Sequence, residues 1–168
     1  MRGLWTWLPM LILSGVVTKV ASASPTDGKN YAGCACRAWS GVATDFFCTI
    51  QNQQQTTLYV DCPAIRDQAP PNGVQSGYIQ VIDQHSTQGV ECTLFMASLQ
   101  GSSLILFSQG PQSSAGSSTA MQQINITFAH DGVGDWYWVG CSVPPVEAGV
   151  SELVMYHLDE SACTSVCG

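Results

Sequence analysis

Charged residues are scarce in this sequence, and basic residues are the scarcest. Only 10% of the 168 residues are charged, with 5 Lys and Arg against 12 Asp and Glu. A chain with so few cations cannot neutralise the phosphates of a nucleic acid or the headgroups of an anionic membrane. The composition therefore argues against both as partners. Its acidity is consistent with an exported protein that negative charge keeps soluble.

The sequence also lacks the short motifs of several enzyme classes. The nucleophile-elbow spacing G-x-S-x-G is absent, and residues 116–120 come closest but lack the second glycine. No C-x-x-C redox motif is present, since Cys34 and Cys36 are one residue too close. Acids and bases are available, but no spacing marks a Ser-His triad or a glycosidase carboxylate pair. The candidates are His85, His130, His157, Asp83, Glu91, Asp131, Asp135, Glu147 and Glu152. We therefore expect a non-enzymatic structural or binding protein, with a small secreted hydrolase as an alternative.

Beyond the first residues, no apolar run is long enough to cross a membrane. The chain begins with Arg2, continues with an apolar stretch over 4–17, and reaches small residues at Ala21 and Ala23. This three-part pattern is typical of a secretory signal peptide, which we place at residues 1–23. It predicts a secreted or periplasmic protein with no membrane span after cleavage.

An even number of cysteines follows the predicted signal peptide. They are Cys34, Cys36, Cys48, Cys62, Cys92, Cys141, Cys163 and Cys167. In an exported chain, such a set indicates disulfides, although eight cysteines allow 105 connectivities. We expect Cys163 and Cys167 to tie the C-terminus back to Cys34 or Cys36, while a zinc site built from the same four cysteines is a weaker alternative.

The rest of the chain alternates between period-2 runs and turn residues, which predicts an all-β protein. About eight strands are expected, over 42–50, 58–62, 78–83, 90–96, 103–107, 124–128, 137–143 and 150–158. The first two should form a hairpin across the polar turn 52–55. The pattern favours a single antiparallel β-sandwich domain over residues 34–168, of jelly-roll or immunoglobulin-like kind.

Two segments have too little apolar surface to form part of this sandwich. Residues 24–33 are polar and contain Gly and Pro, and we expect a flexible N-terminal arm there. Residues 108–120 are rich in Ser and Gly, and we expect a mobile loop.

Several local motifs occur in a familiar order. They are Cys36-Arg37-Ala38, Val60-Asp61-Cys62-Pro63, Val81-Ile82-Asp83, Cys92-Thr93-Leu94, Cys141-Ser142-Val143-Pro144-Pro145 and Tyr156-His157-Leu158-Asp159-Glu160. In this order the chain resembles a group of small secreted bacterial proteins of unknown function, over roughly residues 36–160. The resemblance implies an exported β domain with a few core disulfides and no assigned activity. It involves four of the cysteines, and the pairing expected from it is Cys36 with Cys62 and Cys92 with Cys141.

The aromatic run Trp136-Tyr137-Trp138 is the main candidate for ligand binding. In a strand, neighbouring side chains point to opposite faces, so Trp136 and Trp138 share the outer face if Tyr137 is buried. Exposed indoles stack on sugar rings, which would make the protein a carbohydrate-binding module with a polysaccharide partner. The alternative is that a loop or the N-terminal arm covers both tryptophans. A cell-surface protein is the other partner that we consider.

A turn that precedes this aromatic strand is the candidate for metal binding. Residues 130–135 read His-Asp-Gly-Val-Gly-Asp and place the carboxylates of Asp131 and Asp135 in one flexible turn. Ca²⁺ takes 6–8 oxygen ligands from carboxylates and backbone carbonyls, so this turn is a possible calcium site. The same residues are ordinary for a β-turn, which is the simpler interpretation.

Overall fold

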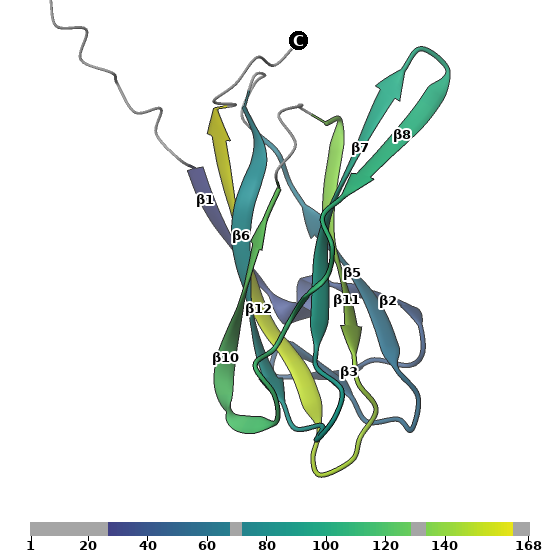
Figure 1. Cartoon of the computed structure of the whole chain (residues 1–168), viewed down its shortest axis with the longest axis vertical. Helices are drawn as coiled ribbons and strands as arrows, with labels where there is room; N and C mark the ends of the chain where they lie inside the picture. Colours follow the sequence, from purple (N-terminus) through teal and green to yellow (C-terminus); the bar gives the residue numbers. More distant parts are fainter. Residues whose placement is uncertain (1–26, 68–71, 129–133, 163–168) are drawn as a thin grey trace, which may run out of the picture.

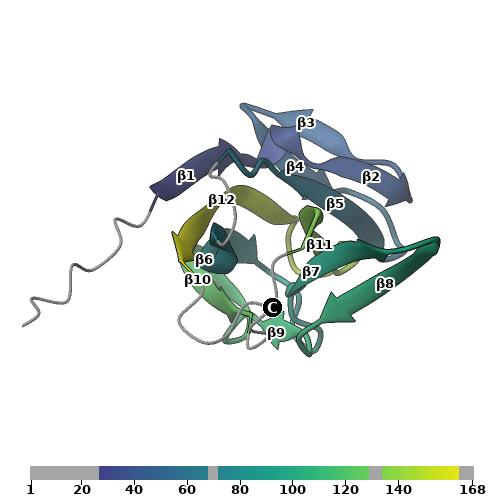
Figure 2. The same ribbon diagram turned by 90° about the horizontal axis from the view of Figure 1, so that it is seen from above.

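The computed structural model describes residues 27–67, 72–128 and 134–162, and these form two β-sheets packed face to face (Figures 1 and 2). The predicted antiparallel β-sandwich is confirmed. The strands are β1 (Asp27–Ala32), β2 (Arg37–Ser40), β3 (Thr44–Phe46), β4 (Thr49–Asn52), β5 (Leu58–Ala64), β6 (Asn72–Asp83), β7 (Glu91–Gln100), β8 (Ser103–Ser108), β9 (Gln112–Ser113), β10 (Ser118–Thr127), β11 (Trp136–Val143) and β12 (Ser151–Ala162). A short 3-10 turn, η1 (Gly33–Ala35), joins β1 to β2.

Each sheet has six strands. The first, here sheet A, has the order β10-β6-β12-β4-β3, and β1 also pairs with β12. The second, sheet B, has the order β2-β5-β11-β7-β8, and β9 pairs with the start of β7. Seen from above, β10, β6, β12 and β1 lie on one side, and β8, β7, β11, β5 and β2 on the other (Figure 2). Strand β11 is therefore a central strand of sheet B, with β5 and β7 as its neighbours.

The core fills the space between the two sheets because alternate residues of each strand point inward. Leu58, Val60 and Cys62 of β5 are buried, while Tyr59 and Asp61 between them are exposed. The same alternation in β7, β11, β6 and β12 supplies the rest of the core. This period-2 pattern is the one from which the sequence predicts strands, so the core follows directly from it.

Two disulfides lie within this core, and both connect elements of sheet B. Cys92 and Cys141 stand opposite each other on β7 and β11, with their Cα atoms 4.2 Å apart. Cys36, just before β2, is bonded to Cys62 of β5. These are the pairs expected from the resemblance. Because Cys36 is bonded to Cys62, its thiolate is not available for the zinc site considered above. For the same reason, Cys36 does not bind the C-terminal cysteines. Cys163 and Cys167 themselves lie outside the described residues.

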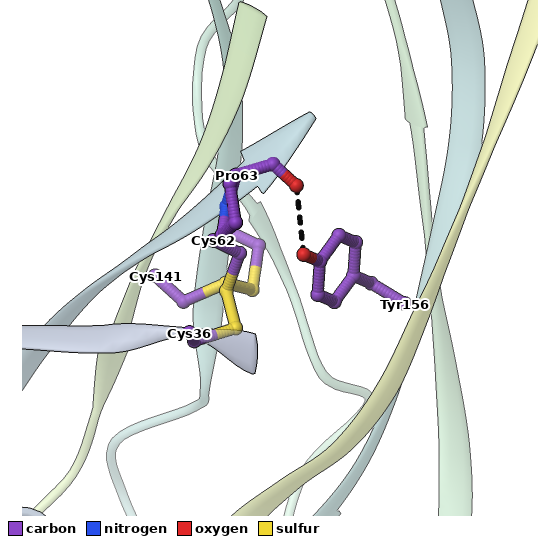
Figure 3. Close-up of a disulfide and its surroundings, with 6 residues drawn as sticks. Cys36, Cys62, Pro63, Cys141 and Tyr156 are labelled. Carbon is purple, nitrogen blue, oxygen red and sulfur yellow. Dashed lines mark hydrogen bonds between the residues drawn. A yellow bond between two sulfur atoms is a disulfide. The ribbon is translucent and has the colours of Figure 1, made fainter. Parts of the chain in front are cut away.

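Contact between the sheets is made by side chains rather than by disulfides. Tyr156 of β12 is fully buried and points across the core toward β5, as Figure 3 shows. Its hydroxyl donates a hydrogen bond of 2.7 Å to the Pro63 carbonyl, and its ring stacks on Tyr31 of β1 at 4.7 Å. Burial, with a further contribution from Tyr31, raises the pKa of Tyr156 well above its usual range, so the hydroxyl stays a donor.

Three sequence-based expectations about individual segments are wrong. The expected flexible arm is ordered from Asp27 onward, because β1 pairs with β12 from Asp27↔Glu160 to Ala32↔Met155. The expected mobile loop contains β9 and the start of β10. Its serines replace apolar packing with polar contacts: the Ser114 hydroxyl donates to the buried Asp83 carboxylate at 2.5 Å.

The expected hairpin between 42–50 and 58–62 does not form either. Positive φ angles at Phe47 and Cys48 end β3 and start β4, so the first run is two strands. Strand β4 then pairs with β12 in sheet A, whereas β5 pairs with β2 and β11 in sheet B. Strands β4 and β5 therefore belong to different sheets, although only five residues separate them.

The predicted signal peptide, residues 1–23, lies outside the described residues. Within the part of the chain that the structure describes, no helix has the length and apolar character needed to span a membrane.

Candidate functional site

Strand β11 carries aromatic side chains on the outer face of sheet B. Tyr137, Val139, Cys141 and Val143 are buried in the core, as the alternation predicts. The residues between them face outward: Trp136 is 50% exposed, and Trp138 is half-buried. The described part of the N-terminal segment covers neither tryptophan, since β1 pairs with β12 in sheet A.

The register of sheet B gathers residues of three strands around the outer face of β11. Trp138 stands opposite Phe95 of β7, and Gly140 stands opposite Asp61 of β5. The result is a groove of about 380 Å³ across the sheet. Its lining residues are Trp39, Tyr59, Asp61, Glu91, Thr93, Phe95, Pro111, Trp138, Gly140, Cys141 and Ser142.

Two aromatic pairs form opposite walls of this groove. On one side, the rings of Phe95 and Trp138 are stacked, with centroids 5.1 Å apart and planes inclined by 9°. On the other side, Trp39 of β2 and Tyr59 of β5 are in contact at 5.2 Å, with their planes tilted by 36°. Trp39 is 65% exposed and Tyr59 is 41% exposed, so a bound molecule would find their ring faces open.

Gly140 forms the floor between the walls, and any side chain there would require the Phe95 ring to move. A Cβ atom on Gly140 would lie 2.8 Å from a Phe95 ring carbon and 3.5 Å from an Asp61 carboxylate oxygen. The missing side chain therefore lets the Phe95 ring lie across the sheet, and it keeps the groove deep at its centre.

The polar groups of the groove are hydroxyls and carboxylates. Asp61 and Glu91 are its charged residues, and among the lining residues there is no Lys, Arg or His in the described part of the chain. Partial burial by the neighbouring rings raises the pKa of Asp61. The hydroxyls of Thr93 and Ser142 both donate and accept hydrogen bonds. The groove thus combines flat apolar surfaces with acceptors and carries a negative charge.

A second hollow, of about 330 Å³, adjoins the first. The two share Tyr59, Glu91 and Ser142, so they are neighbours on sheet B, and together we name them the trough. The second hollow is polar, and its further residues are Thr57, Thr87, Gln88, Gly89 and Pro144. One end of the trough is therefore aromatic, and the other end offers hydrogen-bonding side chains.

The two tryptophans singled out by the sequence have different surroundings. Trp138 lines the groove, whereas Trp136 lies one row farther along the sheet, opposite Ala97. There it joins exposed leucines of the β7–β8 hairpin, Leu104 at 58% and Leu106 at 60% exposure. The tryptophans share a face as predicted, but the aromatic site is built from Trp138 with Phe95, Tyr59 and Trp39.

Sequence reasoning missed Trp39, Tyr59 and Phe95 as site residues. A signal was present for two of them, because Tyr59 and Phe95 occupy outward positions in alternating strands, where polar residues are usual. An aromatic ring at such a position is left without core contacts. Nothing in the sequence, however, shows that these strands are neighbours of β11.

The predicted calcium ligands are only partly described. Asp131 lies outside the described residues. The Asp135 carboxylate accepts a hydrogen bond of 2.7 Å from the Leu99 backbone, and the Asp135 N–H donates to the Ala97 carbonyl at 2.8 Å. Asp135 thus fastens the start of β11 to β7.

A different acidic cluster has the geometry of a cation site, and a lysine occupies it. The carboxylate oxygens of Asp27, Asp67 and Glu160 lie within 4.8 Å of one another. The Lys29 ammonium sits among them at 3.0, 2.8 and 3.1 Å, respectively. Burial lowers the pKa of Lys29, but the three carboxylates outweigh this effect and raise it above its usual range. The positive charge that this cluster needs is thus supplied by the chain itself.

The histidines do not form a nucleophile–base arrangement in the described part of the chain. His157 contacts Asn30 at 2.8 Å and Asp159 at 3.0 Å, and its ring stacks on Tyr78. His85 accepts two backbone N–H bonds through Nδ1, at 3.0 and 3.2 Å, within the turn that follows it. His130 lies outside the described residues. No hydrogen bond joins a histidine ring to a serine hydroxyl among the described residues.

The other acidic candidates make structural contacts. Asp83 is fully buried and accepts hydrogen bonds from the hydroxyls of Ser151 and Ser114 at 3.1 and 2.5 Å. Glu152 accepts from the Gln51 amide at 2.8 Å. Hydrogen bonds from Ser86 lower the pKa of Glu147. These carboxylates hold strands and turns in place rather than facing a common cleft.

No family model matches the chain, and no curated protein matches its sequence. Solved structures with a similar β fold include a low-affinity xylan-binding module, CBM86, from Roseburia intestinalis, with 15% identity, a TM-score of 0.44, and coverage of 81% of this chain and 97% of that one. Another is the module CBM36 in complex with calcium and xylotriose, with 12% identity, a TM-score of 0.42, and 78% and 98% coverage.

A third is a family two carbohydrate esterase from Cellvibrio japonicus, with 9% identity and a TM-score of 0.44. The match covers 84% of this chain but only 37% of the esterase, so this chain spans little more than a third of that protein's length. At these TM-scores, no function is carried over from the three structures.

Proposed function

We propose that this protein is a secreted, non-enzymatic carbohydrate-binding module, and that the trough on sheet B binds a neutral polysaccharide chain. The observation that carries the proposal is the groove with two aromatic pairs as walls, Trp138 with Phe95 and Trp39 with Tyr59.

Open ring faces suit sugar rings in particular. One face of a pyranose presents C–H groups, which pack against an aromatic ring and remove apolar surface from water. The rim of the sugar presents hydroxyls, which need both donors and acceptors. Ser142, Thr93 and the carboxylates of Asp61 and Glu91 supply these next to the rings.

The charge of the trough selects among polysaccharides. Both of its charged side chains are acidic, so a polyuronate or a sulfated glycan would bring like charges together in a partly dehydrated groove. A neutral glycan avoids this repulsion, and its hydroxyls donate to the carboxylates. The two adjoining hollows give the trough room for more than a single sugar ring.

Affinity electrophoresis of the folded protein through gels that contain xylan, mannan, a mixed-linkage glucan or polygalacturonate tests the proposal. We expect retardation by at least one neutral polysaccharide and none by polygalacturonate. Trp138→Ala should weaken binding by about tenfold, because one stacked ring is worth about 1 kcal/mol or more.

Trp136→Ala is the matched control, since it removes an indole from the same strand and face but outside the groove. This variant should keep wild-type affinity. Circular dichroism and melting temperature must show that both variants are folded. Absence of retardation by every neutral polysaccharide, or equal loss in both variants, would contradict the proposal.

A further inference from the structure

Two cysteines of the described chain lie outside both core disulfides, and they are neighbours in space. Cys34 is half-buried in η1, and Cys48 is exposed in the turn between β3 and β4. The Cys34 backbone N–H donates a hydrogen bond of 3.0 Å to the Cys48 carbonyl. The structure thus brings together two thiols that the resemblance leaves unassigned.

Their backbones are close enough for a disulfide. The bonded N lies about 1.5 Å from the Cα of Cys34 and the bonded O about 2.4 Å from the Cα of Cys48, so the 3.0 Å hydrogen bond keeps the two Cα atoms within about 7 Å of each other. Disulfides span Cα distances of about 4.4–6.8 Å. The side chains also meet, since hydrogen bonding with the Cys48 thiol, followed by burial, raises the pKa of the Cys34 thiol.

We infer that Cys34 and Cys48 form a third disulfide, which restrains the segment that carries Trp39. In the step, both thiols lose their protons and give up two electrons in total. The disulfide of a thiol–disulfide oxidoreductase, or of oxidised glutathione, accepts the electrons and leaves as two thiols. Export into an oxidising compartment supplies this partner.

The backbone at Cys48 has a conformation that needs support from neighbouring contacts. Phe47 and Cys48 have φ angles of 48° and 63°, in the left-handed region that residues with side chains seldom adopt. Such a turn persists where neighbouring contacts hold it. A covalent bond from Cys48 to η1 provides such a contact, and Gly33 sets η1 tightly against β12, since a Cβ there would lie 2.2 Å from the Leu153 carbonyl oxygen.

The bridge closes a loop that includes one wall of the groove. Residues 34–48 contain β2, whose Trp39 contacts Tyr59. Strand β2 is short, lies at the edge of sheet B and is held there by a pairing with β5 that is irregular after Ala38. The Cys36–Cys62 bond fixes the start of this segment, and a bond at Cys48 fixes its end. This role in ligand binding rests on the proposed function, whereas the bridge itself does not.

Thiol labelling identifies the partner of Cys34. The purified full-length protein is denatured at acidic pH without reductant, alkylated and mapped by mass spectrometry. Wild-type protein should carry no label on Cys34 or Cys48. In Cys34→Ser, the newly labelled residue should be Cys48, and in the reciprocal Cys48→Ser, which changes an exposed position, it should be Cys34.

Cys167→Ser serves as the control and should leave Cys48 unlabelled. Label on Cys163 or Cys167 in Cys34→Ser would show that the C-terminal tail holds Cys34, and the inference would be wrong. Label on Cys34 and Cys48 in the wild type would overturn it as well.

Hydrogen exchange tests the restraint on the Trp39 segment. Backbone amides of residues 37–46 should exchange about tenfold faster in Cys34→Ser/Cys48→Ser than in the wild type, with β7 and β11 unchanged. Equal rates would mean that the bridge does not restrain this wall. Neither experiment uses a glycan, so their outcome is independent of whether the trough binds one.

Discussion

Single charged side chains have opposite roles on the two sheets. On sheet A, the Lys29 ammonium forms ion pairs with three carboxylates, one of which, Glu160, is almost completely buried. On sheet B, Asp61 faces an aromatic groove whose described lining contains no Lys, Arg or His, although Arg37 of β2 stands opposite Asp61 in the sheet. The first charge is paired within its cluster, and the second has no ion pair in the part of the chain that the structure describes.

Replacing Lys29 with Met keeps the aliphatic stem but removes the charge. We expect the free energy of unfolding at pH 7 to fall by roughly 2 kcal/mol, because the buried Glu160 carboxylate loses its ion pair with Lys29. Because the pKa of Lys29 is raised, this stabilisation is complete at neutral pH and is lost only above about pH 10. Urea unfolding of the wild type and of Lys29→Met, at pH 7 and above about pH 10, measures the difference in free energy of unfolding.

The same variant tests whether the cluster is a cation site filled by lysine. Without the ammonium, Asp27, Asp67 and Glu160 offer oxygens that Ca²⁺ prefers. Millimolar Ca²⁺ should therefore raise the melting temperature of Lys29→Met and leave that of the wild type unchanged. An equal response of the two proteins would contradict this interpretation.

Ionisation of Asp61 lowers the stability of the fold, whereas the charge of Lys29 raises it. A raised carboxyl pKa means that the folded state binds the proton more tightly, so stability falls as pH rises above about 4. Asp61→Asn should match the wild type at pH 3 and melt about 1 °C higher at pH 7, a small shift because the side chain is largely hydrated. Thermal unfolding at the two pH values checks this, and an Asn variant that is less stable only at pH 7 would contradict it.

At the scale of the element, β11 has separate roles on its two faces. Its inward residues include Cys141 and Val139 of the core, and its outward residues form the centre of the groove. A glycine in a central strand is unusual because it packs poorly, so Gly140 indicates a steric demand on the outer face.

Gly140→Ala should weaken glycan binding by about tenfold while the melting temperature changes by only a few degrees. The added methyl group displaces the Phe95 ring and so disrupts its stack on Trp138. Gly110→Ala is the control, because its Cβ would meet no atom within 4 Å. Affinity electrophoresis compares the two, and unchanged retardation of Gly140→Ala would show that the Phe95 wall is not part of the site.

At the scale of the whole molecule, the two core disulfides lie within sheet B, while side-chain packing joins the two sheets. Both core bridges lie on sheet B, which also carries the groove, and Tyr156 reaches across the core from sheet A. Rigidity is thus concentrated in the sheet whose outer face must keep its aromatic rings in position.

Removal of each bridge should destabilise the protein by an amount that rises with the logarithm of the length of the loop that it closes. The Cys92–Cys141 loop spans 49 residues and the Cys36–Cys62 loop 26, so Cys92→Ala/Cys141→Ala should cost about 0.5 kcal/mol more than Cys36→Ala/Cys62→Ala. Each double variant should lose about 3–4 kcal/mol in urea unfolding. A larger loss for the shorter loop would mean that contacts around Cys36, rather than chain entropy, dominate.

The sequence by itself determined which residues face the core and that the fold is an all-β sandwich. Alternation between apolar and polar residues is a property of neighbours in the chain, so Tyr137 and Val139 could be assigned to the inside without knowledge of any partner strand. Turn and strand signals failed where long-range contacts decided: β1 has a polar sequence but pairs with β12, and β4 and β5, close in sequence, belong to different sheets.

The candidate site was decided by the tertiary structure. Trp39, Tyr59, Phe95 and Trp138 come from four strands that are spread over a hundred residues, and only the register of β2, β5, β11 and β7 brings their rings together. Register depends on the closure of long loops and on the fit of two sheet faces, which no local pattern records. For the same reason, Trp136 and Trp138 looked equivalent in the sequence, although only Trp138 has aromatic partners across the strands.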